Sequence, residues 1–292
     1  MHLVVQAVIL GVLIGGVYAL MASGLTLVFG IMRVINVAQG AMVVLGAYLS
    51  YSLFTSAGID PLLSVLLIAP AMFALGVGIH RLFIRSLRAE NGEEMSLLVT
   101  WATALGIEGA LSVIYTTNLR STIPGYAQRS WEVLGYRVAE VRFFGFAISG
   151  VILVGLYLLL AYTRFGRSVR ATVQNPTSAK LLGVDADRVS ALGFGIGAAT
   201  AAAAGAIFGI IYPFNPGSHY DLISRLLSIV VLGGLGSIGG AVVAALLLGV
   251  AESVVAVTIS PSWASFVFFV VLILILLFRP QGLFGVRERG AL

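Results

Sequence analysis

The sequence predicts an all-α polytopic membrane protein with about nine transmembrane helices, within a range of eight to ten. Two observations lead to this fold class. Of the 292 residues, 59% are hydrophobic and 10% are charged, whereas globular proteins carry about 25% charged residues. The charges are also clustered, which leaves long charge-free stretches that reach the roughly 20 residues a helix needs to cross a bilayer. These stretches are Met1–Met32, Val34–Ile59, Phe143–Thr163, Val189–Tyr220, Leu226–Ala251 and Ser253–Phe278.

Glycine, proline and charged residues divide the apolar stretches into successive crossings. Their centres lie near residues 17, 46, 73, 105, 153, 201, 229, 250 and 271. The first stretch is too long for the core of a signal peptide and has no basic region before it, so we assign it to the membrane. No segment between the crossings is large enough for a soluble domain. Residues 1–292 are therefore predicted to form a single transmembrane domain.

Basic residues predict the orientation, because cytoplasmic loops are enriched in Lys and Arg. If residues 164–188 form a cytoplasmic loop, alternation of the crossings puts 12 of the 17 basic residues on that side. Most of the others belong to one outer loop, residues 117–142. The basic residues on the outer side are Arg120, Arg129, Arg137, Arg142 and Arg225. The N-terminus is then outside and the C-terminus cytoplasmic.

The loop at 164–188 carries the signals of a short, capped helix. Asn175 can accept a backbone N–H as N-cap, Pro176 suits the first helical position, and Gly183 can take the left-handed conformation that ends a helix. Thr177–Leu182 would form about one and a half turns and could dock into a groove of a cytoplasmic protein. The alternative is a helix that rests at the lipid interface. The residues expected on its exposed surface are Ala179, Lys180, Leu182 and Val184.

A polar interruption follows the first predicted helix. Asn36, Gln39 and Gly40 lie between two apolar stretches and could form a broken segment that lines a pathway. Irregular backbone at membrane depth is tolerated only where protein or water covers it. The alternative is an ordinary cytoplasmic turn in which Asn36 caps the next helix. Ser23 and Thr26 are weaker candidates for the same pathway.

Two carboxylates fall within apolar stretches, where an unpaired charge is costly and faces the bundle interior or water. Glu108 or Glu252 could orient the ammonium group of a substrate. The alternative is that each side chain hydrogen-bonds a neighbouring helix. Asp221 and Arg225 are four residues apart and are predicted to form an intrahelical ion pair.

Glycines four residues apart allow membrane helices to approach closely, since lipid provides little hydrophobic force between helices. Three such pairs are expected to pack helices together, and the last pair belongs to a glycine-rich turn with Gly233 and Gly234. The pairs are Gly11 with Gly15, Gly205 with Gly209, and Gly236 with Gly240.

Several kinds of chemistry are excluded by the sequence. It has no cysteine, and His2, His80 and His219 lack metal-site spacing, so we predict no metal; His219 is expected in an outer loop. The region Gly233–Gly240 lacks the lysine of a phosphate-binding loop, which means that ATP must be hydrolysed elsewhere. The basic residues form no single stripe that would fit nucleic acid. No nucleophile–base pair suggests an enzyme.

Three parts of the chain resemble one known family, the permeases of branched-chain amino-acid ABC transporters. The first part is similar to the opening helices of that family, the second to its ATPase-coupling segment, and the third to its glycine-rich turn. They are Gly15-Gly-Val-Tyr-Ala-Leu with Ser23-Gly-Leu-Thr-Leu-Val-Phe-Gly30 and Asn36-Val-Ala-Gln-Gly40; Gly166–Gly183; and Val231–Ala241 followed by Glu252.

The resemblance implies one half of the translocation pathway of an ATP-binding cassette importer in the bacterial inner membrane. The substrate would be a branched-chain or related amino acid. The implied partners are a second homologous permease, two cytoplasmic ATPase subunits that hold ATP and Mg, and an extracytoplasmic amino-acid-binding protein, with no cofactor on this chain. The residues assigned to ATPase coupling are Arg170, Asn175, Pro176, Thr177, Ala179, Lys180, Leu182 and Gly183.

Two alternatives remain open at this point. One is a secondary transporter or channel for a small polar solute, which would work without an ATPase. The other is an ABC permease for a different substrate, such as urea, an amide, a sugar or a nucleoside.

Overall fold

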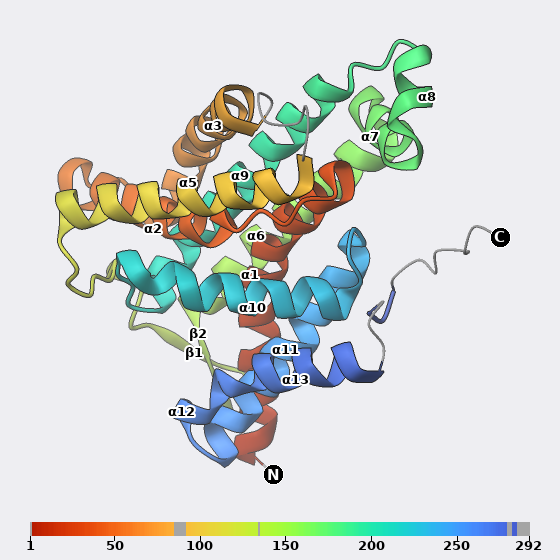
Figure 1. Ribbon diagram of the computed structural model, residues 1–292. Coiled ribbons are helices and arrows are strands. Elements are labelled where there is room, and N and C mark those ends of the chain that lie inside the picture. The colour runs from red at the N-terminus through yellow and green to blue at the C-terminus, as the bar shows by residue number, and fades with distance from the viewer. Residues whose placement is uncertain (1, 85–91, 134, 279–281, 285–292) are drawn as a thin grey trace.

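The computed structural model describes residues 2–84, 92–133, 135–278 and 282–284, and these residues are largely helical (Figure 1). Within them, eight helices are long and apolar enough to span a membrane. This confirms the all-α polytopic membrane fold. The spans are α1 (His2–Met32), α2 (Ala38–Ala57), α3 (Pro61–Ile79) with the π-helix η1 (His80–Ile84), α5 (Gly92–Tyr115), α6 (Glu140–Tyr162), α9 (Ala186–Ile211), α11 (Ile238–Thr258), and α12 (Pro261–Ala264) with α13 (Phe266–Phe278).

The ninth predicted crossing is a shorter helix. It is α10 (His219–Gly233), which follows the 3-10 turn η2 (Pro216–Ser218). Its 15 residues give a length of about 22 Å, less than the roughly 30 Å of a hydrocarbon core. All nine predicted centres fall inside α10 or one of the eight spans. The number of full-length spans is thus at the lower end of the predicted range.

Two elements were not predicted from the sequence. The loop expected at 117–142 contains a β-hairpin of β1 (Ser130–Val133) and β2 (Tyr136–Ala139), which pair antiparallel. The loop ends earlier than the predicted residue 142, because α6 begins at Glu140. The amphipathic helix α7 (Arg164–Gln174) precedes the short predicted helix α8 (Pro176–Leu181). Its polar composition resembled a loop, but its buried residues Val169 and Thr172 are three apart on one face.

Helices α1 and α9 form the centre of the bundle. In their most apolar windows, 56% of the α1 residues and 72% of the α9 residues are buried, compared with 11% for α12–α13. In Figure 1, α1 runs from the N-terminus at the bottom through the middle of the molecule. It packs against α11, α9 and α6, while α9 also packs against α2 and α3. The exposed side chains of α13 are large and apolar, as expected of a face toward lipid.

Glycines mark the closest helix contacts. A Cβ added to Gly11 would lie 2.6 Å from the Cα of Val250 on α11, and a Cβ on Gly205 would lie 1.9 Å from the carbonyl oxygen of Val43 on α2. Both distances are too short for a side chain. Only glycine allows these backbones to approach so closely. Gly15 also belongs to the contact between α1 and α11, and Gly209 to the contact between α9 and α2.

Gly205→Ala is expected to lower the stability of the protein by roughly 1–3 kcal/mol, because the added carbon would push α9 away from α2. The control is Gly150→Ala on α6, where an added Cβ meets nothing within 4 Å. That change should be neutral or stabilising by about 0.5–1 kcal/mol. The measurement is the apparent Tm in detergent, and equal Tm values for the two variants would contradict the packing described here.

The two ends of the bundle differ in structure. At one end, the N-terminal residues of α1 meet the hairpin: the rings of His2 and Tyr136 stack with centroids 4.5 Å apart, and the Arg137 N–H donates to Gln6 Oε1 at 3.0 Å. At the other end lie α7 and α8, because α6 leads from the hairpin to α7. Figure 1 shows this separation.

The loop that contains the hairpin is also attached to the start of α3. Asp60 caps α3 by accepting from the Leu62 N–H, and the Tyr126 hydroxyl donates to the same carboxylate, each at 2.9 Å. Burial, with the Asp60 carboxylate nearby, raises the pKa of Tyr126 well above its usual value. Tyr126 therefore holds its proton at a pH where a free tyrosine, with a pKa of about 10, has lost it.

Tyr126 should make stability depend on alkaline pH. A pKa raised by folding gives stability that is complete below about pH 10 and is lost as the pH rises toward the folded pKa. Tm should thus fall more between about pH 9 and pH 11 in the wild type than in Tyr126→Phe. Parallel Tm profiles for the two proteins would contradict this assignment.

Candidate functional site

The side chain of Gln39 links three helices beside the break between α1 and α2. It is fully buried, and its Nε2 donates to the carbonyl oxygens of Met21 on α1 (3.3 Å) and Gly197 on α9 (3.1 Å). The next residue, Gly40, lies against α10, since an added Cβ would be 2.6 Å from the carbonyl oxygen of His219. Protein therefore covers the first turn of α2, directly after the break.

Asn36 lies inside the break and does not cap α2. The N-cap position is held by Val37, without a side-chain bond, so the alternative in which Asn36 caps α2 is wrong. Its Nδ2 donates to Gln39 Oε1 at 3.2 Å. Its Oδ1 is buried and has no hydrogen-bond partner among the described residues. The Val37 N–H donates to Thr100 Oγ1 at 3.3 Å, which attaches the break to α5.

Ser23 and Thr26 bond to their own helix. Each hydroxyl donates at 2.8 Å to a backbone carbonyl of α1, that of Leu20 and that of Ala22 respectively. Both side chains are fully buried. The hydroxyls are thus satisfied within α1.

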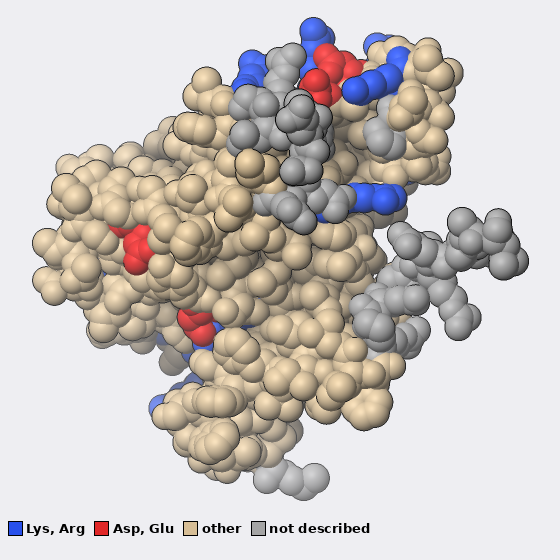
Figure 2. Space-filling model, viewed as in Figure 1, with Lys and Arg blue, Asp and Glu red and all other residues tan. Residues whose placement is uncertain are grey.

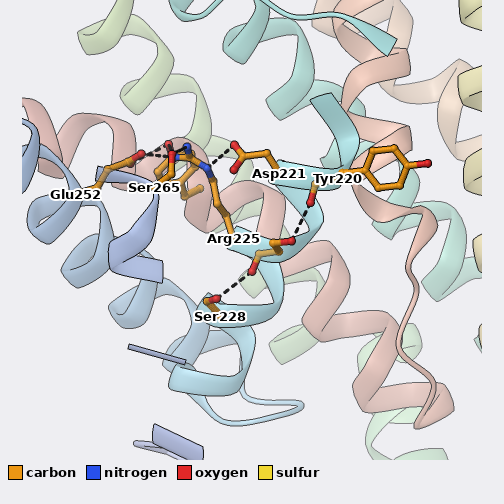
Figure 3. Close-up of polar contacts among 8 residues, drawn as sticks. Tyr220, Asp221, Arg225, Ser228, Glu252 and Ser265 are labelled. Atoms are coloured by element: carbon orange, nitrogen blue, oxygen red, sulfur yellow. Dashed lines mark hydrogen bonds and ion pairs between the residues drawn. The ribbon is translucent and has the colours of Figure 1, made fainter. Parts of the chain in front are cut away.

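Glu252 on α11 belongs to a buried ion-pair network centred on Arg225 of α10. The Arg225 Nη1 pairs with Glu252 Oε1, and the Tyr18 hydroxyl donates to Glu252 Oε2 at 2.9 Å. Arg225 Nε pairs with Asp221 at 2.8 Å, as predicted, and Nη2 donates to Ser265 at 2.9 Å (Figure 3). Glu252 therefore bonds neighbouring helices, the alternative considered from the sequence.

Arg225 lies inside the bundle. From the sequence, it had been counted among the basic residues on the outer side. Its side chain is 14% exposed, and its guanidinium carbon lies 5.1 Å from the ring centroid of Phe268 on α13. The guanidinium connects α10 with α1, α11 and the start of α13. A charge at this depth is tolerated because its donors are paired.

Glu108 on α5 has a different environment. Its Oε2 accepts from His219 Nε2 at 3.0 Å and from the Tyr220 hydroxyl at 3.1 Å, and its side chain is 25% exposed. His219, expected in an outer loop, is the first residue of α10 and is 2% exposed. Gly217 lies beside this cluster, since an added Cβ would be 3.5 Å from Asn215 Oδ1 and 3.9 Å from Glu108 Oε1.

The segment from α7 to α8 has the caps that the sequence suggested. Asn175 Oδ1 accepts from the backbone N–H groups of Thr177 and Ser178, both at 3.0 Å. The helix α8 ends at Leu181, and Gly183 has a left-handed φ of 81°. The Val184 N–H donates to the Ala179 carbonyl at 3.0 Å and closes the turn.

Two leucines form the most exposed apolar part of this segment. Leu181 is 85% exposed and Leu182 is 82% exposed, whereas Ala179 is buried. The expectation that Ala179 faces outward is therefore wrong: it packs inward while the leucines project. Lys180 is also exposed. Arg170 donates to the carbonyl oxygens of Leu160 and Ala161 and so caps the end of α6.

The glycine-rich region joins α10 to α11 as a turn. Gly234 and Gly236 have positive φ angles of 94° and 84°, which only glycine adopts readily. A Cβ on Gly240 would lie 2.0 Å from the carbonyl oxygen of Gly233. Since α11 begins at Ile238, the third glycine pair serves this turn and is not a pair on one helix.

The described residues contain no group of three or more His, Asp or Glu side chains that could hold a metal ion. The residues that stand out are instead the break at Asn36 and Gln39, the two carboxylate clusters, and the exposed leucines of α8. These features match a protein that moves a solute and couples to another protein.

Comparison with known families gives the same result. A family model described as "Branched-chain amino acid transport system / permease component" matches residues 8–276. The chain belongs to this permease family. As a transport permease component, it is not an enzyme. No solved structure matches the permease.

The permease is similar to proteins from several organisms over almost its whole length. It is 33% identical to the high-affinity branched-chain amino acid transport system permease protein BraD of Pseudomonas aeruginosa, over 97% of this chain and 96% of BraD. It is 33% identical to the corresponding protein LivH of Escherichia coli, over 95% and 94%. A probable LivH of Methanocaldococcus jannaschii is 29% identical, over 91% and 88%.

Several residues of these clusters were not singled out from the sequence. Tyr18 and Ser265 complete the Arg225 network, and Tyr220 completes the Glu108 cluster. Leu181 projects beside Leu182. The signal for Tyr18 was its place between glycines on a fully apolar helix, where a hydroxyl needs a partner. The partners of Tyr18 and Tyr220 lie more than 100 residues away and are fixed only by the fold.

Proposed function

We propose that this permease forms half of the translocation pathway of an ATP-binding cassette importer for branched-chain amino acids in the bacterial inner membrane. The names of BraD and LivH support the substrate class. The observation that carries the coupling role is the capped helix α8 with Leu181 and Leu182 projecting from it. With α10 counted as the ninth crossing, the N-terminus is outside, and α7, α8 and the C-terminus are cytoplasmic.

Helix α8 has the form expected of a coupling element. Its Asn175 cap and Gly183 turn fix its ends, and buried Ala179 anchors it to the rest of the chain. Leu181 and Leu182 are then presented on a rigid turn, which suits insertion into an apolar groove of a partner. The cap residues Pro176 and Thr177 set the start of this helix, and Lys180 adds a positive charge beside it.

Basic side chains at this end support the same orientation. Arg164, Arg167, Lys180 and Arg188 are exposed on α7, α8 and the start of α9. In Figure 2, the visible Lys and Arg side chains gather mostly at the end of the molecule that holds α7 and α8, while most of the remaining surface is uncharged. Positive charge at a cytoplasmic face follows the positive-inside rule.

The partners in this proposal are a second homologous permease, two cytoplasmic ATPase subunits and an extracytoplasmic amino-acid-binding protein. ATP and Mg bind the ATPases, and this chain holds no cofactor. The binding protein meets the end with the hairpin, which is opposite to α8. Asn36 in the break and Gln39 beside it contribute polar groups near the pathway, and the Oδ1 of Asn36, which has no partner among the described residues, is the available acceptor.

The test is assembly followed by ATP hydrolysis. The permease is co-purified with the second permease and ATPases from the same transport system, placed in nanodiscs, and given binding protein with or without leucine. Leucine-loaded binding protein should raise ATP hydrolysis several-fold. A complex that assembles but shows the same rate with and without leucine and binding protein would overturn the importer proposal.

A further inference from the structure

The β-hairpin has one apolar face and one polar face. Successive side chains of a strand point to opposite sides of the sheet. Trp131 is opposite Val138 in the hairpin, and Glu132 is opposite Arg137. On the polar face, Arg137 Nε pairs with Glu132 Oε1 at 3.1 Å, and both side chains are exposed. This alternation is typical of antiparallel strands that separate an apolar environment from water.

Trp131, on the apolar face, packs against the beginning of α6. Its ring centroid lies 5.4 Å from that of Phe143 and 5.7 Å from that of Phe144, and the two phenylalanine rings are 5.9 Å apart. All three contacts are edge-to-face, an arrangement that aromatic pairs favour. The three side chains, which we call the aromatic cluster, therefore hold the hairpin against α6.

The aromatic cluster is not covered by the rest of the chain. Trp131 is 40% exposed, Phe143 42% and Phe144 39%. Within the described part of the chain, the Trp131 indole N–H has no hydrogen-bond partner. A contiguous exposed patch of large apolar side chains is typical of a surface that contacts a membrane or another protein.

The length of α6 places the cluster at a membrane boundary. The helix has 23 residues and is about 34 Å long, slightly more than the roughly 30 Å of a hydrocarbon core. Phe143 and Phe144 are its fourth and fifth residues, within about 6 Å of its first residue. The cluster therefore lies where the hydrocarbon core meets the lipid head groups.

An apolar stripe on α6 continues from the cluster across the membrane. Val151, Val154 and Leu158 are exposed, and they follow Phe144 at steps of seven, three and four residues, which puts them on one face of the helix. In the most apolar window of α6, only 17% of the residues are buried. A soluble partner could reach the cluster but not this stripe, whereas lipid covers both. The continuity of the two surfaces therefore favours lipid.

The hairpin also contacts the beginning of α1 at the same level. The Arg137 N–H donates to Gln6 Oε1 at 3.0 Å. Leu3 and Val4, in the first turn of α1, are exposed and apolar, as expected of a helix that enters lipid here. The hairpin thus connects the ends of two membrane spans.

We propose that the hairpin is an interfacial anchor: the aromatic cluster inserts among the lipid head groups, and the face with Glu132 and Arg137 stays in water. The Trp131 ring combines a large apolar surface with one N–H donor, which suits a boundary where lipid ester and phosphate oxygens are available. Since the hairpin bonds to α1 and packs on α6, it holds both spans at one depth. The inference does not depend on the transported substrate.

A single fluorine label tests the environment of Trp131. The chain has three tryptophans, and Trp101 and Trp263 are exposed, so Trp101→Phe and Trp263→Phe should leave the fold intact. Fluorotryptophan incorporated into this chain alone then gives one fluorine NMR signal in nanodiscs, with or without partner subunits. Its broadening is compared for lipids with a nitroxide near the head group, lipids with a nitroxide at the chain end, and a water-soluble gadolinium chelate.

The matched control moves the label to the other face of the hairpin. Ser130→Trp combined with Trp131→Phe, in the same background, places the single tryptophan one residue earlier, on the face that contains Glu132. Ser130 is exposed. The control signal should respond mainly to the gadolinium chelate.

The Trp131 signal should be broadened at least about threefold more by the nitroxide near the head group than by the one at the chain end, because the boundary lies about 15 Å from the bilayer centre. The result should be the same in the assembled complex. A signal that responds to gadolinium as strongly as the control and to neither lipid would put the hairpin in water and overturn the proposal. Loss of the lipid effect on assembly would assign the cluster to a subunit interface and also overturn it.

Discussion

Arg225→Met is expected to destabilise the protein by about 3–5 kcal/mol, the usual cost of leaving one member of a buried ion pair without its partner. The Glu252 carboxylate would stay 11% exposed with only the Tyr18 hydroxyl as a donor. The helices α1, α10, α11 and α13 would lose their shared cation. The result should be seen as a large fall in Tm and in the yield of monodisperse protein in detergent.

The exposed half of the network supplies a matched control. Asp221 is 51% exposed, so Asp221→Asn should cost no more than about 1 kcal/mol, as for surface ion pairs. Arg225→Met combined with Glu252→Leu should be more stable than Arg225→Met alone, since no buried charge remains. A double variant as unstable as the sum of its single changes would show that the network acts through packing and not through charge pairing.

Leu182→Asp, alone or with Leu181→Asp, is expected to reduce leucine-stimulated ATP hydrolysis at least about tenfold while the protein stays folded. Both side chains are more than four-fifths exposed, so the changes remove no core contact. A carboxylate forced into an apolar groove of the ATPase would be desolvated without a partner, at a cost of several kcal/mol. Co-purification of the ATPase and the hydrolysis rate are measured together.

Gln174→Asp is the control for this prediction, because Gln174 is exposed on α7 and lies before the Asn175 cap. It adds the same charge to the same segment but leaves the leucines in place. Hydrolysis should remain near the wild-type rate. If the complex that contains Leu182→Asp stays assembled and hydrolyses ATP at the normal rate, α8 rests at the lipid interface and does not couple the permease to the ATPase.

The positions of the crossings were predictable because charges are excluded from the membrane. All nine predicted centres fall inside helices. The caps of α8 were equally predictable from the sequence, since Asn175, Pro176 and Gly183 each act on backbone groups within a few residues. The length of α10 could not be predicted from the sequence, because the end of this helix depends on the glycine turn and on the contacts of Arg225. Local patterns therefore predicted elements well and their tertiary roles poorly.

The candidate sites show the same limit. The sequence singled out Glu108 and Glu252 as equivalent carboxylates, and the fold separates them: one meets Arg225, the other His219 and Tyr220. Arg225 was assigned to the outside because charge alone cannot tell a loop from a buried ion pair. Leu181 was missed since a six-residue helix gives no periodicity from which to read its exposed face.

Uptake of radiolabelled leucine into proteoliposomes tests the central claim most directly. The permease is reconstituted with the second permease and the ATPases, with ATP inside the vesicles on the ATPase side and leucine-loaded binding protein outside. We predict concentrative uptake that requires ATP, the binding protein and intact Leu182. Uptake by this chain alone, at the same rate with and without ATP, would contradict the account and make the protein a secondary transporter or channel.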